Sequence, residues 1–128
     1  MVRWGNLLSV TFRCSNGIRQ GGQLSPLLYN VYTVDLNHHL QAAGVGFYVE
    51  GPWLNTLSYA DDMVLLSPTV TALQKLLEVC HTYAVPHDIV YNTSETVFML
   101  VQPKQSQGRR YPRVRLGNED LSYVDEFR

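Results

Sequence analysis

The sequence predicts an α+β fold in which two main helices pack on one face of an antiparallel sheet. Two Ser-Pro pairs each stand shortly before an apolar stripe with helical spacing. Runs of β-forming residues lie before, between and after these stripes, and turn residues separate them. A chain of 128 residues suffices for one modest core, so we expect a single domain over residues 1–128.

The first helix is expected to begin at Ser25-Pro26 and to end at Gly44. Serine can cap free amides, proline is preorganised for the first helical position, and glycine commonly ends a helix. We expect the apolar stripe of this helix to lie in the core. The stripe consists of Leu28, Tyr32, Leu36 and Leu40, widened by Leu27 and Val31.

A second helix is expected after Ser67-Pro68, where the same helix-start chemistry recurs. Pro86 is expected to close it, because proline cannot continue the hydrogen-bond ladder of a helix. Its apolar stripe consists of Leu73, Leu76, Leu77, Cys80 and Ala84.

Strands are placed by short runs of β-forming or alternating residues. We expect strands at residues 9–13, 46–50 and 96–101, and a hairpin that joins residues 111–116 to 121–124 through Gly117-Asn118. Residues 16–22 are expected to form a loop, because three glycines let the backbone turn and approach a ligand closely. Residues 102–108 are expected to form a polar loop.

Two adjacent carboxylates stand in the segment Tyr59-Ala60-Asp61-Asp62, between the apolar runs 57–60 and 63–66. This pattern predicts a tight hairpin with its acids at the tip. Adjacent residues on a regular strand point to opposite faces, so consecutive carboxylates can approach one ion only at a turn. Divalent cations need such hard oxygen ligands, but aspartate is also a common turn residue. The pair is therefore either a solvated turn or part of a metal site.

A glycine-rich segment lies upstream at residues 17–26, with the sequence Gly-Ile-Arg-Gln-Gly-Gly-Gln-Leu-Ser-Pro. Together with the acid pair, in this order and spacing, it resembles reverse transcriptases, in particular those of non-long-terminal-repeat retrotransposons. The family pattern is a Gly-x-x-Gln-Gly stretch, then Leu-Ser-Pro at a helix start, then a Tyr/Phe-Ala-Asp-Asp hairpin. Residues 27–30, 35–36 and 92–101 are also similar to the family, so the resemblance spans about residues 16–128.

The resemblance implies the palm subdomain of an RNA-directed DNA polymerase, a nucleotidyltransferase that works with two Mg²⁺ ions. Asp61 would be the main metal ligand, Asp62 would assist it, and Tyr59 would lie beside the primer end. The implied partners are an RNA template, a DNA primer and a deoxynucleoside triphosphate. The loop bordering nucleotide and template would comprise Gln20, Gly21 and Gly22, together with Arg19 as a contact to phosphate.

The sequence departs from the family pattern in three respects. The family brings another metal-binding aspartate from a strand before the glycine-rich segment, whereas none of residues 1–15 is acidic. The fingers and the thumb of the polymerase are expected to be missing. Glu95 stands where the family has a lysine, and its negative charge would repel phosphate.

These departures predict an incomplete palm that does not polymerise efficiently by itself. The alternative is a non-catalytic retrotransposon-derived remnant or a nucleic-acid-binding module. An unrelated α+β domain with a chance acidic turn is a third interpretation, and it requires both motifs to be coincidental.

Charge is distributed unevenly along the chain, although the net charge is only −1. Residues 1–30 carry three arginines and no acid, residues 31–100 carry seven acids and one lysine, and residues 101–128 carry six basic residues and four acids. A metal-dependent nucleic-acid enzyme can use this layout, with acids for cations and arginines for phosphates. The basic residues of 104–115 can equally form an edge that discourages sheet aggregation.

The two cysteines, Cys14 and Cys80, show no metal-ligand spacing and are expected as free thiols in a reducing compartment. No apolar run is long enough to span a membrane, and the first residues do not resemble a signal peptide. The expected location is therefore intracellular, in the nucleus or the cytoplasm.

Overall fold

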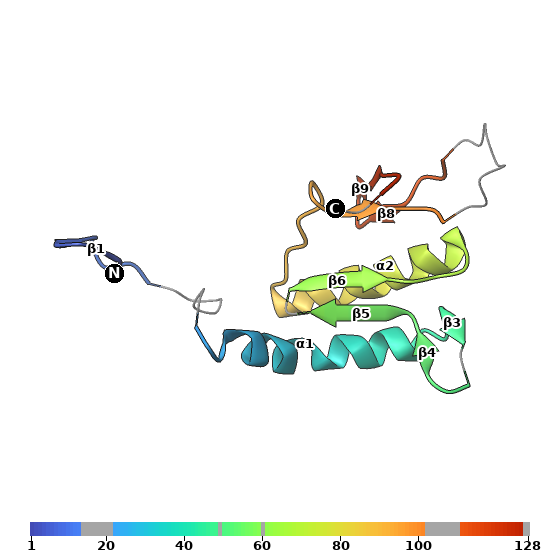
Figure 1. The fold of residues 1–128 in the computed structure, drawn as a ribbon, viewed down its shortest axis with the longest axis horizontal. Helices are drawn as coiled ribbons and strands as arrows, with labels where there is room; N and C mark the ends of the chain where they lie inside the picture. The colour runs from blue at the N-terminus through green and yellow to red at the C-terminus, as the bar shows by residue number, and fades with distance from the viewer. Residues whose placement is uncertain (14–21, 49, 60, 102–110, 127–128) are drawn as a thin grey trace.

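Two helices lie side by side in the computed structural model of the chain, which describes residues 1–13, 22–48, 50–59, 61–101 and 111–126 (Figure 1). Helix α1 spans Ser25–Ala42 and helix α2 spans Val70–Ala84. A short 3-10 helix, η1, follows α2 at Val85–His87. The two long helices occupy the segments in which the sequence predicts them.

The strands of the described residues form five two-stranded pairs and not one continuous sheet. Strand β1 (Arg3–Trp4) pairs with β2 (Leu7–Leu8), β3 (Phe47–Tyr48) with β4 (Trp53–Leu54), and β5 (Thr56–Tyr59) with β6 (Asp62–Leu65), all antiparallel. Strand β8 (Arg115–Leu116) pairs with β9 (Glu119–Asp120) in the same sense, whereas β10 (Ser122–Tyr123) pairs with β7 (Val97–Phe98) in parallel. The predicted α+β class is confirmed. The strands, however, form separate pairs instead of the single antiparallel sheet that the sequence predicts.

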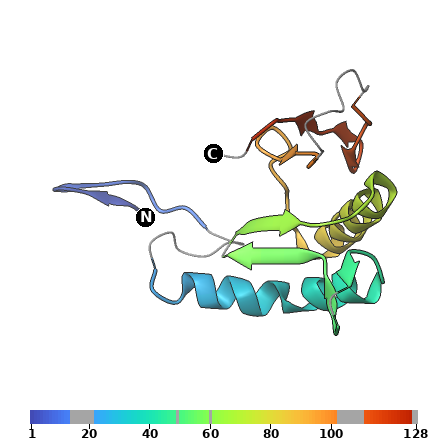
Figure 2. The same cartoon turned by 45° about the vertical axis from the view of Figure 1, so that its right-hand side comes forward.

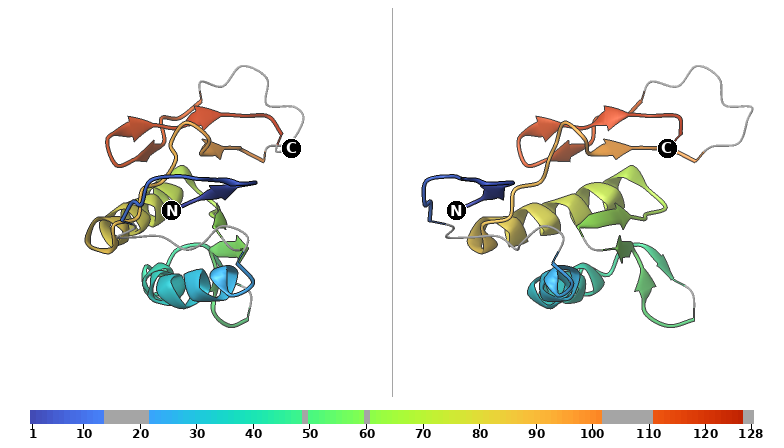
Figure 3. Two further views of the ribbon diagram at one scale, coloured as in Figure 1. Left: turned by 90° about the vertical axis from the view of Figure 1, so that its left-hand side faces the viewer. Right: turned by 60° about the vertical axis from the view of Figure 1, so that its left-hand side comes forward.

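The strand pairs occupy different positions around the two helices. The β5–β6 hairpin lies along one face of the two helices, as Figures 1 and 2 show. Strands β7 to β10 lie on the other side of α2 from α1, an order that both views of Figure 3 repeat. The β1–β2 hairpin projects away from all of these elements in Figures 1 and 2.

Helix α1 buries only two of the six residues of its predicted apolar stripe. Leu36 and Leu40 are buried and belong to the core between α1 and α2. The expectation of burial is wrong for the other members of the stripe, which stand in the N-terminal half of the helix and outside the core between α1 and α2. The exposed members are Leu27, Leu28, Val31 and Tyr32.

Helix α2 begins two residues later than its Ser-Pro signal, and its cap is Thr69. The Thr69 hydroxyl accepts a hydrogen bond of 3.1 Å from the amide of Ala72, which satisfies one of the free donors of the first turn. Most of the predicted stripe is buried, and Tyr83 joins it. Helix α2 is therefore the central element of the core.

The core consists of two clusters on opposite sides of α2. One joins α1 to α2 through Leu36, Leu40, Leu76, Cys80 and Tyr83. The other joins α2 to the C-terminal strands through Leu77, Phe98, Val114, Leu116 and Leu121. Leu65 and Tyr91 pack against both clusters, so the two form a continuous core.

The strands and loops agree only in part with those that the sequence predicts. Residues 9–13 contain no strand, and the pairing in this part of the chain is β1–β2 instead. The turn at Gly117-Asn118 is confirmed, with Gly117 at φ +60° and β8 and β9 on either side. The expected second strand at residues 121–124 is wrong for this hairpin, because β8 pairs with β9 and the strand at Ser122–Tyr123 pairs with β7 instead. The predicted loops at residues 16–21 and 102–108 lie outside the described residues.

Cys80 is a free, buried thiol, as predicted, and Cys14 lies outside the described residues. Among the described residues, neither helix combines the length and the apolar character that crossing a bilayer requires.

Candidate functional site

The acid pair stands at the tip of the β5–β6 hairpin. The register pairs Tyr59 with Asp62, so that only residues 60 and 61 connect the strands. Asp61 is the turn residue before β6, and Asp62 is the first residue of that strand. Both aspartates are exposed, as the sequence predicts for acids at a hairpin tip. Tyr59 is also exposed, with 84% of its surface accessible.

The alternation of residues along β6 explains why the hairpin lies where it does. Met63 and Leu65 are partly buried and pack against the core between α1 and α2, whereas Val64 is exposed. Side chains alternate between the faces of a strand, so one face of the hairpin is attached to the helices. The hairpin therefore lies along the helices, and its tip does not project alone into solvent.

Tyr29 of α1 lies close to the tip. Burial of the phenol, and then the negative charge of Asp61, raise the pKa of Tyr29 above its ordinary value of 10.0. Figure 1 shows the turn end of the β5–β6 hairpin beside the N-terminal half of α1. No sequence pattern marks Tyr29, because the residue whose charge acts on it, Asp61, is far away in the chain.

Gly22 is the one member of the predicted nucleotide-binding loop that the structure describes. It is half-buried, and its carbonyl accepts a hydrogen bond of 3.1 Å from the amide of Ser25 at the start of α1. Arg19, Gln20 and Gly21 lie outside the described residues. The structure thus places Asp61 toward the N-terminal end of α1, the helix that follows the glycine-rich segment in the sequence.

Asn55 anchors the other end of the hairpin. It is fully buried, with 0% of its surface exposed, and its carbonyl accepts a bond of 2.9 Å from the amide of Leu66. Its side-chain nitrogen Nδ2 donates bonds of 2.7 Å to the carbonyl of Leu40 and 3.0 Å to that of Val45. The hydrogen-bond partners of this buried amide can be recognised only in the folded structure.

The oxygen ligands at the tip fit a magnesium ion. Magnesium is commonly held by one or two carboxylates and keeps waters and substrate phosphates as its remaining ligands. Asp61 and Asp62 would supply such carboxylates from an exposed turn. Within the described ranges, no group of three or more His, Cys, Asp or Glu side chains could hold a metal ion by itself.

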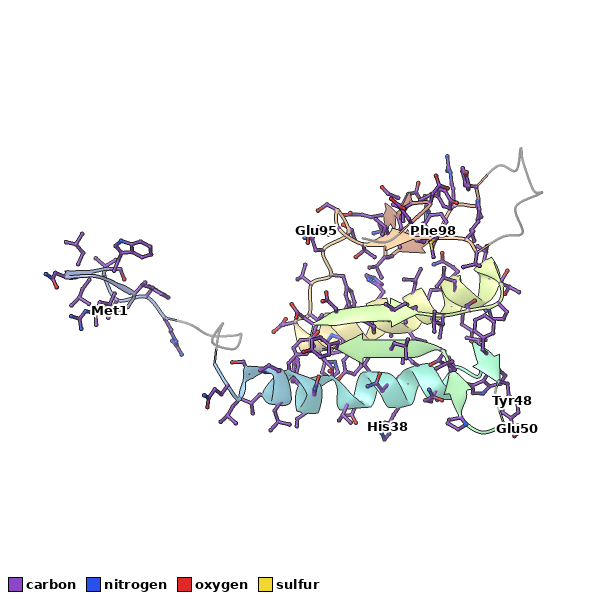
Figure 4. The ribbon with its side chains drawn as sticks, viewed as in Figure 1. Met1, His38, Tyr48, Glu50, Glu95 and Phe98 are labelled. Atoms are coloured by element: carbon purple, nitrogen blue, oxygen red, sulfur yellow. The ribbon has the colours of Figure 1, made fainter. Side chains whose placement is uncertain are left out.

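Glu95 lies in a turn before β7. The amides of Glu95 and Thr96 donate bonds of 3.2 and 2.9 Å to the carbonyl of Asn92, and the Glu95 side chain is exposed. Figure 4 shows Glu95 at the end of the molecule where β5 meets β6, opposite the end that carries Tyr48 and Glu50. A negative charge thus stands at the same end of the molecule as the acid pair.

The basic residues of the C-terminal strands are partly engaged in ion pairing. Arg115 Nε donates a bond of 2.7 Å to Asp120 Oδ1, and this bond lowers the pKa of Asp120. Arg113 is exposed beside this pair and lowers the same pKa further. Lys104, Arg109 and Arg110 lie outside the described residues.

Comparison with known proteins assigns the chain to one family model. The model of the reverse transcriptases (RNA-dependent DNA polymerases) matches residues 3–118, which includes α1, the acid hairpin, α2 and the turn before β7. Neither a curated protein nor a solved structure matched the chain.

Proposed function

The chain belongs to the reverse transcriptase family, and we propose that Asp61 and Asp62 are the carboxylates that hold its catalytic divalent metal. Reverse transcriptases are RNA-directed DNA polymerases that use a divalent metal and bind a nucleic-acid template and deoxynucleoside triphosphates. The observation that carries the proposal is the position of the acid pair. It forms the exposed tip of a hairpin that is attached to two helices, beside Tyr29 at the start of α1.

The proposed metal is Mg²⁺, held mainly by Asp61 and assisted by Asp62. When bound, it would stabilise the negative charge that develops on the attacking oxygen of the primer and on the leaving pyrophosphate. The chain's own residues position the reactants, because phosphoryl transfer requires little else from the protein. Tyr59 stands opposite Asp62 and lies beside the primer end in this proposal. Arg19, Gln20, Gly21 and Gly22 border the incoming nucleotide and the template.

Tyr29 contributes a neutral wall to this site. The phenol is uncharged at neutral pH, as any tyrosine with a pKa of 10.0 or higher is, so the ring places no second negative charge beside Asp61. The Asp61 carboxylate is exposed, so a metal and phosphates could reach it from solvent in this proposal.

We further propose a non-long-terminal-repeat retrotransposon origin and one partial palm domain. The glycine-rich segment and the acid hairpin support this origin. The first acid in the 128 residues is Asp35, and it follows the glycine-rich segment instead of preceding it. These residues therefore hold two of the three metal-binding aspartates that the family pattern requires. We expect them to extend a primer poorly when they act alone.

Titration with Mn²⁺, a paramagnetic substitute for Mg²⁺, tests the metal site. Amide NMR signals of β6 and of the first turns of α1 should broaden first. Asp61→Asn should weaken Mn²⁺ binding by about tenfold, and Asp62→Asn by less. Asp35→Asn neutralises an exposed aspartate further along α1 and should leave binding unchanged. Equal broadening in the wild type and in Asp61→Asn would refute the proposed site.

Primer extension on an RNA template with Mg²⁺ tests the activity of the chain alone. Weak or undetectable extension is expected. Robust extension that disappears in Asp61→Asn would contradict the expected inactivity and would confirm the role of Asp61.

A non-catalytic nucleic-acid-binding module is the second candidate function, and Glu95 favours it. An exposed carboxylate at the end of the molecule that carries the acid pair opposes the binding of a triphosphate. Such a module would bind primer–template in a salt-dependent manner, and the triple replacement of Arg109, Arg110 and Arg113 by alanine would abolish the binding. Binding that persists without salt dependence would argue against this candidate.

A further inference from the structure

We propose that Asn55 is a positioning residue that fixes where the tip with Asp61 and Asp62 stands relative to α1. The inference rests on the proposed function of that tip and adds a residue that contacts neither metal nor substrate. Asn55 is the buried polar residue of the described part of the chain, and it lies immediately before β5. Figure 4 places Tyr48, on the neighbouring strand pair, at the end of the molecule away from the tip.

Four hydrogen bonds of Asn55 join three segments. Its Nδ2 donates to the carbonyl of Leu40 in the last turn of α1 and to that of Val45 after the helix. Its Oδ1 accepts a bond of 3.2 Å from Gln41 Nε2. Its main-chain carbonyl accepts the amide of Leu66, the residue after β6. The end of α1 and both strands of the hairpin are thus held at one point.

Gln41 reinforces this point from α1. Its Nε2 also donates a bond of 2.7 Å to the carbonyl of Trp53 in β4. Because the Asn55 amide donates through nitrogen to two carbonyls and accepts through oxygen from an amide, each atom of its head group has a matching partner. An aspartate at this position would direct an oxygen at two carbonyls and would repel them.

The backbone approaches Asn55 so closely that only glycine fits at position 46. A Cβ atom on Gly46 would lie 2.6 Å from Asn55 Cβ, and Gly46 has φ +134°. The loop after α1 is therefore fitted around the Asn55 side chain, which leaves the base of the hairpin little freedom to shift.

The length of the hairpin makes the fixed base important for the tip. Asp61 is six residues from Asn55, and a strand advances roughly 3.3 Å per residue. A slip of one residue at the base would thus move the tip by roughly 3.3 Å and turn its side chains to the opposite face. Magnesium–oxygen distances are about 2.1 Å, so such a slip would destroy a metal site.

Hydrogen exchange and Mn²⁺ binding test the inference, with Asn55→Ala as the variant. Amides of β5 and β6 should exchange about tenfold faster than in the wild type, while those of α2 change little. The Mn²⁺ affinity should fall by about fivefold or more, in line with the loss of an indirect support of a ligand.

Gln74→Ala is the matched control. Gln74 is also an amide clamp, with two bonds of 3.0 Å to the main chain of Arg115, but it joins α2 to β8. This variant should speed exchange in β8 and leave both the hairpin and Mn²⁺ binding unchanged. If Asn55→Ala does not fold, Gln41→Ala serves instead and should produce a smaller acceleration in β5 and β6.

The outcomes separate the inference from the function on which it rests. A folded Asn55→Ala protein with wild-type exchange in the hairpin would overturn the inference. Equal acceleration of the hairpin in Asn55→Ala and Gln74→Ala would also overturn it. A wild-type protein in which Mn²⁺ broadening is the same as in Asp61→Asn would instead overturn the proposed function, whatever the exchange of the hairpin.

Discussion

At the scale of single residues, charge at the hairpin end of the molecule decides what can bind there. Asp61 and Asp62 attract cations, and a bound cation would in turn attract the phosphates of a nucleotide. Glu95 adds a third exposed negative charge at this end, with no basic residue in its own turn from residue 92 to residue 96.

Glu95→Lys is predicted to strengthen the binding of a deoxynucleoside triphosphate with Mg²⁺. Reversal of one exposed charge should change the affinity by about three- to tenfold at low salt, and the difference should shrink at about 0.5 M salt. Isothermal titration at both salt concentrations measures it. Glu78→Lys, an equal reversal on the exposed surface of α2, should have no such effect. Equal gains in the two variants would show that only net charge matters.

The acid hairpin could be predicted from sequence at this scale, whereas its surroundings could not. Adjacent aspartates between two apolar runs specify a tip, because the alternation along β6 and the turn are local properties. The effect of the Asp61 charge on the pKa of Tyr29 and the bonds of Asn55 to α1 depend on packing between distant segments. No periodicity in the sequence carries that information.

At the scale of elements, the two helices show why an apolar stripe does not guarantee burial. Both stripes have helical spacing, but α2 supplies residues to both core clusters, whereas α1 supplies only Leu36 and Leu40, from its C-terminal half, to one of them. The sequence predicts the spacing because it is a property of one helix. It does not predict which side chains of the helix are buried, because that depends on the elements that the fold places next to it.

Leu40→Ala and Leu27→Ala are predicted to differ strongly in their effects on stability. Leu40 is 0% exposed and Leu27 is 60% exposed, on the same helix. Leu40→Ala should lower the free energy of unfolding by about 2–5 kcal/mol, because it leaves a cavity. Leu27→Ala should change it by less than about 0.5 kcal/mol. Urea unfolding of both variants measures the difference, and similar losses would mean that Leu27 is also packed.

Cys80 on α2 predicts how stability depends on alkaline pH. Burial raises the pKa of this thiol from 9.0 to about 11. Because the folded pKa is raised, the contribution of Cys80 to stability is complete below pH 9 and is lost as the pH rises to about 11. Two pKa units correspond to about 2–3 kcal/mol.

Cys80→Ala should therefore lose less stability than the wild type between pH 9 and pH 11. Urea unfolding at intervals over this range measures the two slopes. A comparison at pH 7 provides the control, because the thiol is protonated there in both states and only the packing of the side chain differs. Parallel slopes for the two proteins would contradict a buried, pKa-shifted thiol.

At the scale of the whole molecule, the pairing of distant strands was the least predictable feature. The sequence predicts the β8–β9 turn through Gly117-Asn118, since turn residues act locally. It does not predict that β10 pairs in parallel with β7, which brings together segments more than twenty residues apart. Leu121, between β9 and β10, is buried in the cluster under these strands, so this pairing is tied to the core of α2.

The N-terminal hairpin, by contrast, is not packed against the core. Strands β1 and β2 pair with each other, and Figures 1 and 2 show them apart from the helices. Trp4 and Val10 are 85% and 86% exposed. A segment without buried contacts to the core contributes little to the free energy of unfolding, since stability comes mainly from buried apolar surface.

Deletion of residues 1–13 is therefore predicted to leave the free energy of unfolding unchanged within about 0.5 kcal/mol. The same deletion should reduce self-association at high concentration, because it removes a group of exposed apolar side chains. Urea unfolding measures the first effect and sedimentation velocity the second. Leu121→Ala, which truncates a buried side chain in the C-terminal cluster, is the comparison and should cost about 2–5 kcal/mol. A loss of similar size on deletion would mean that the N-terminal hairpin packs against the helices in solution.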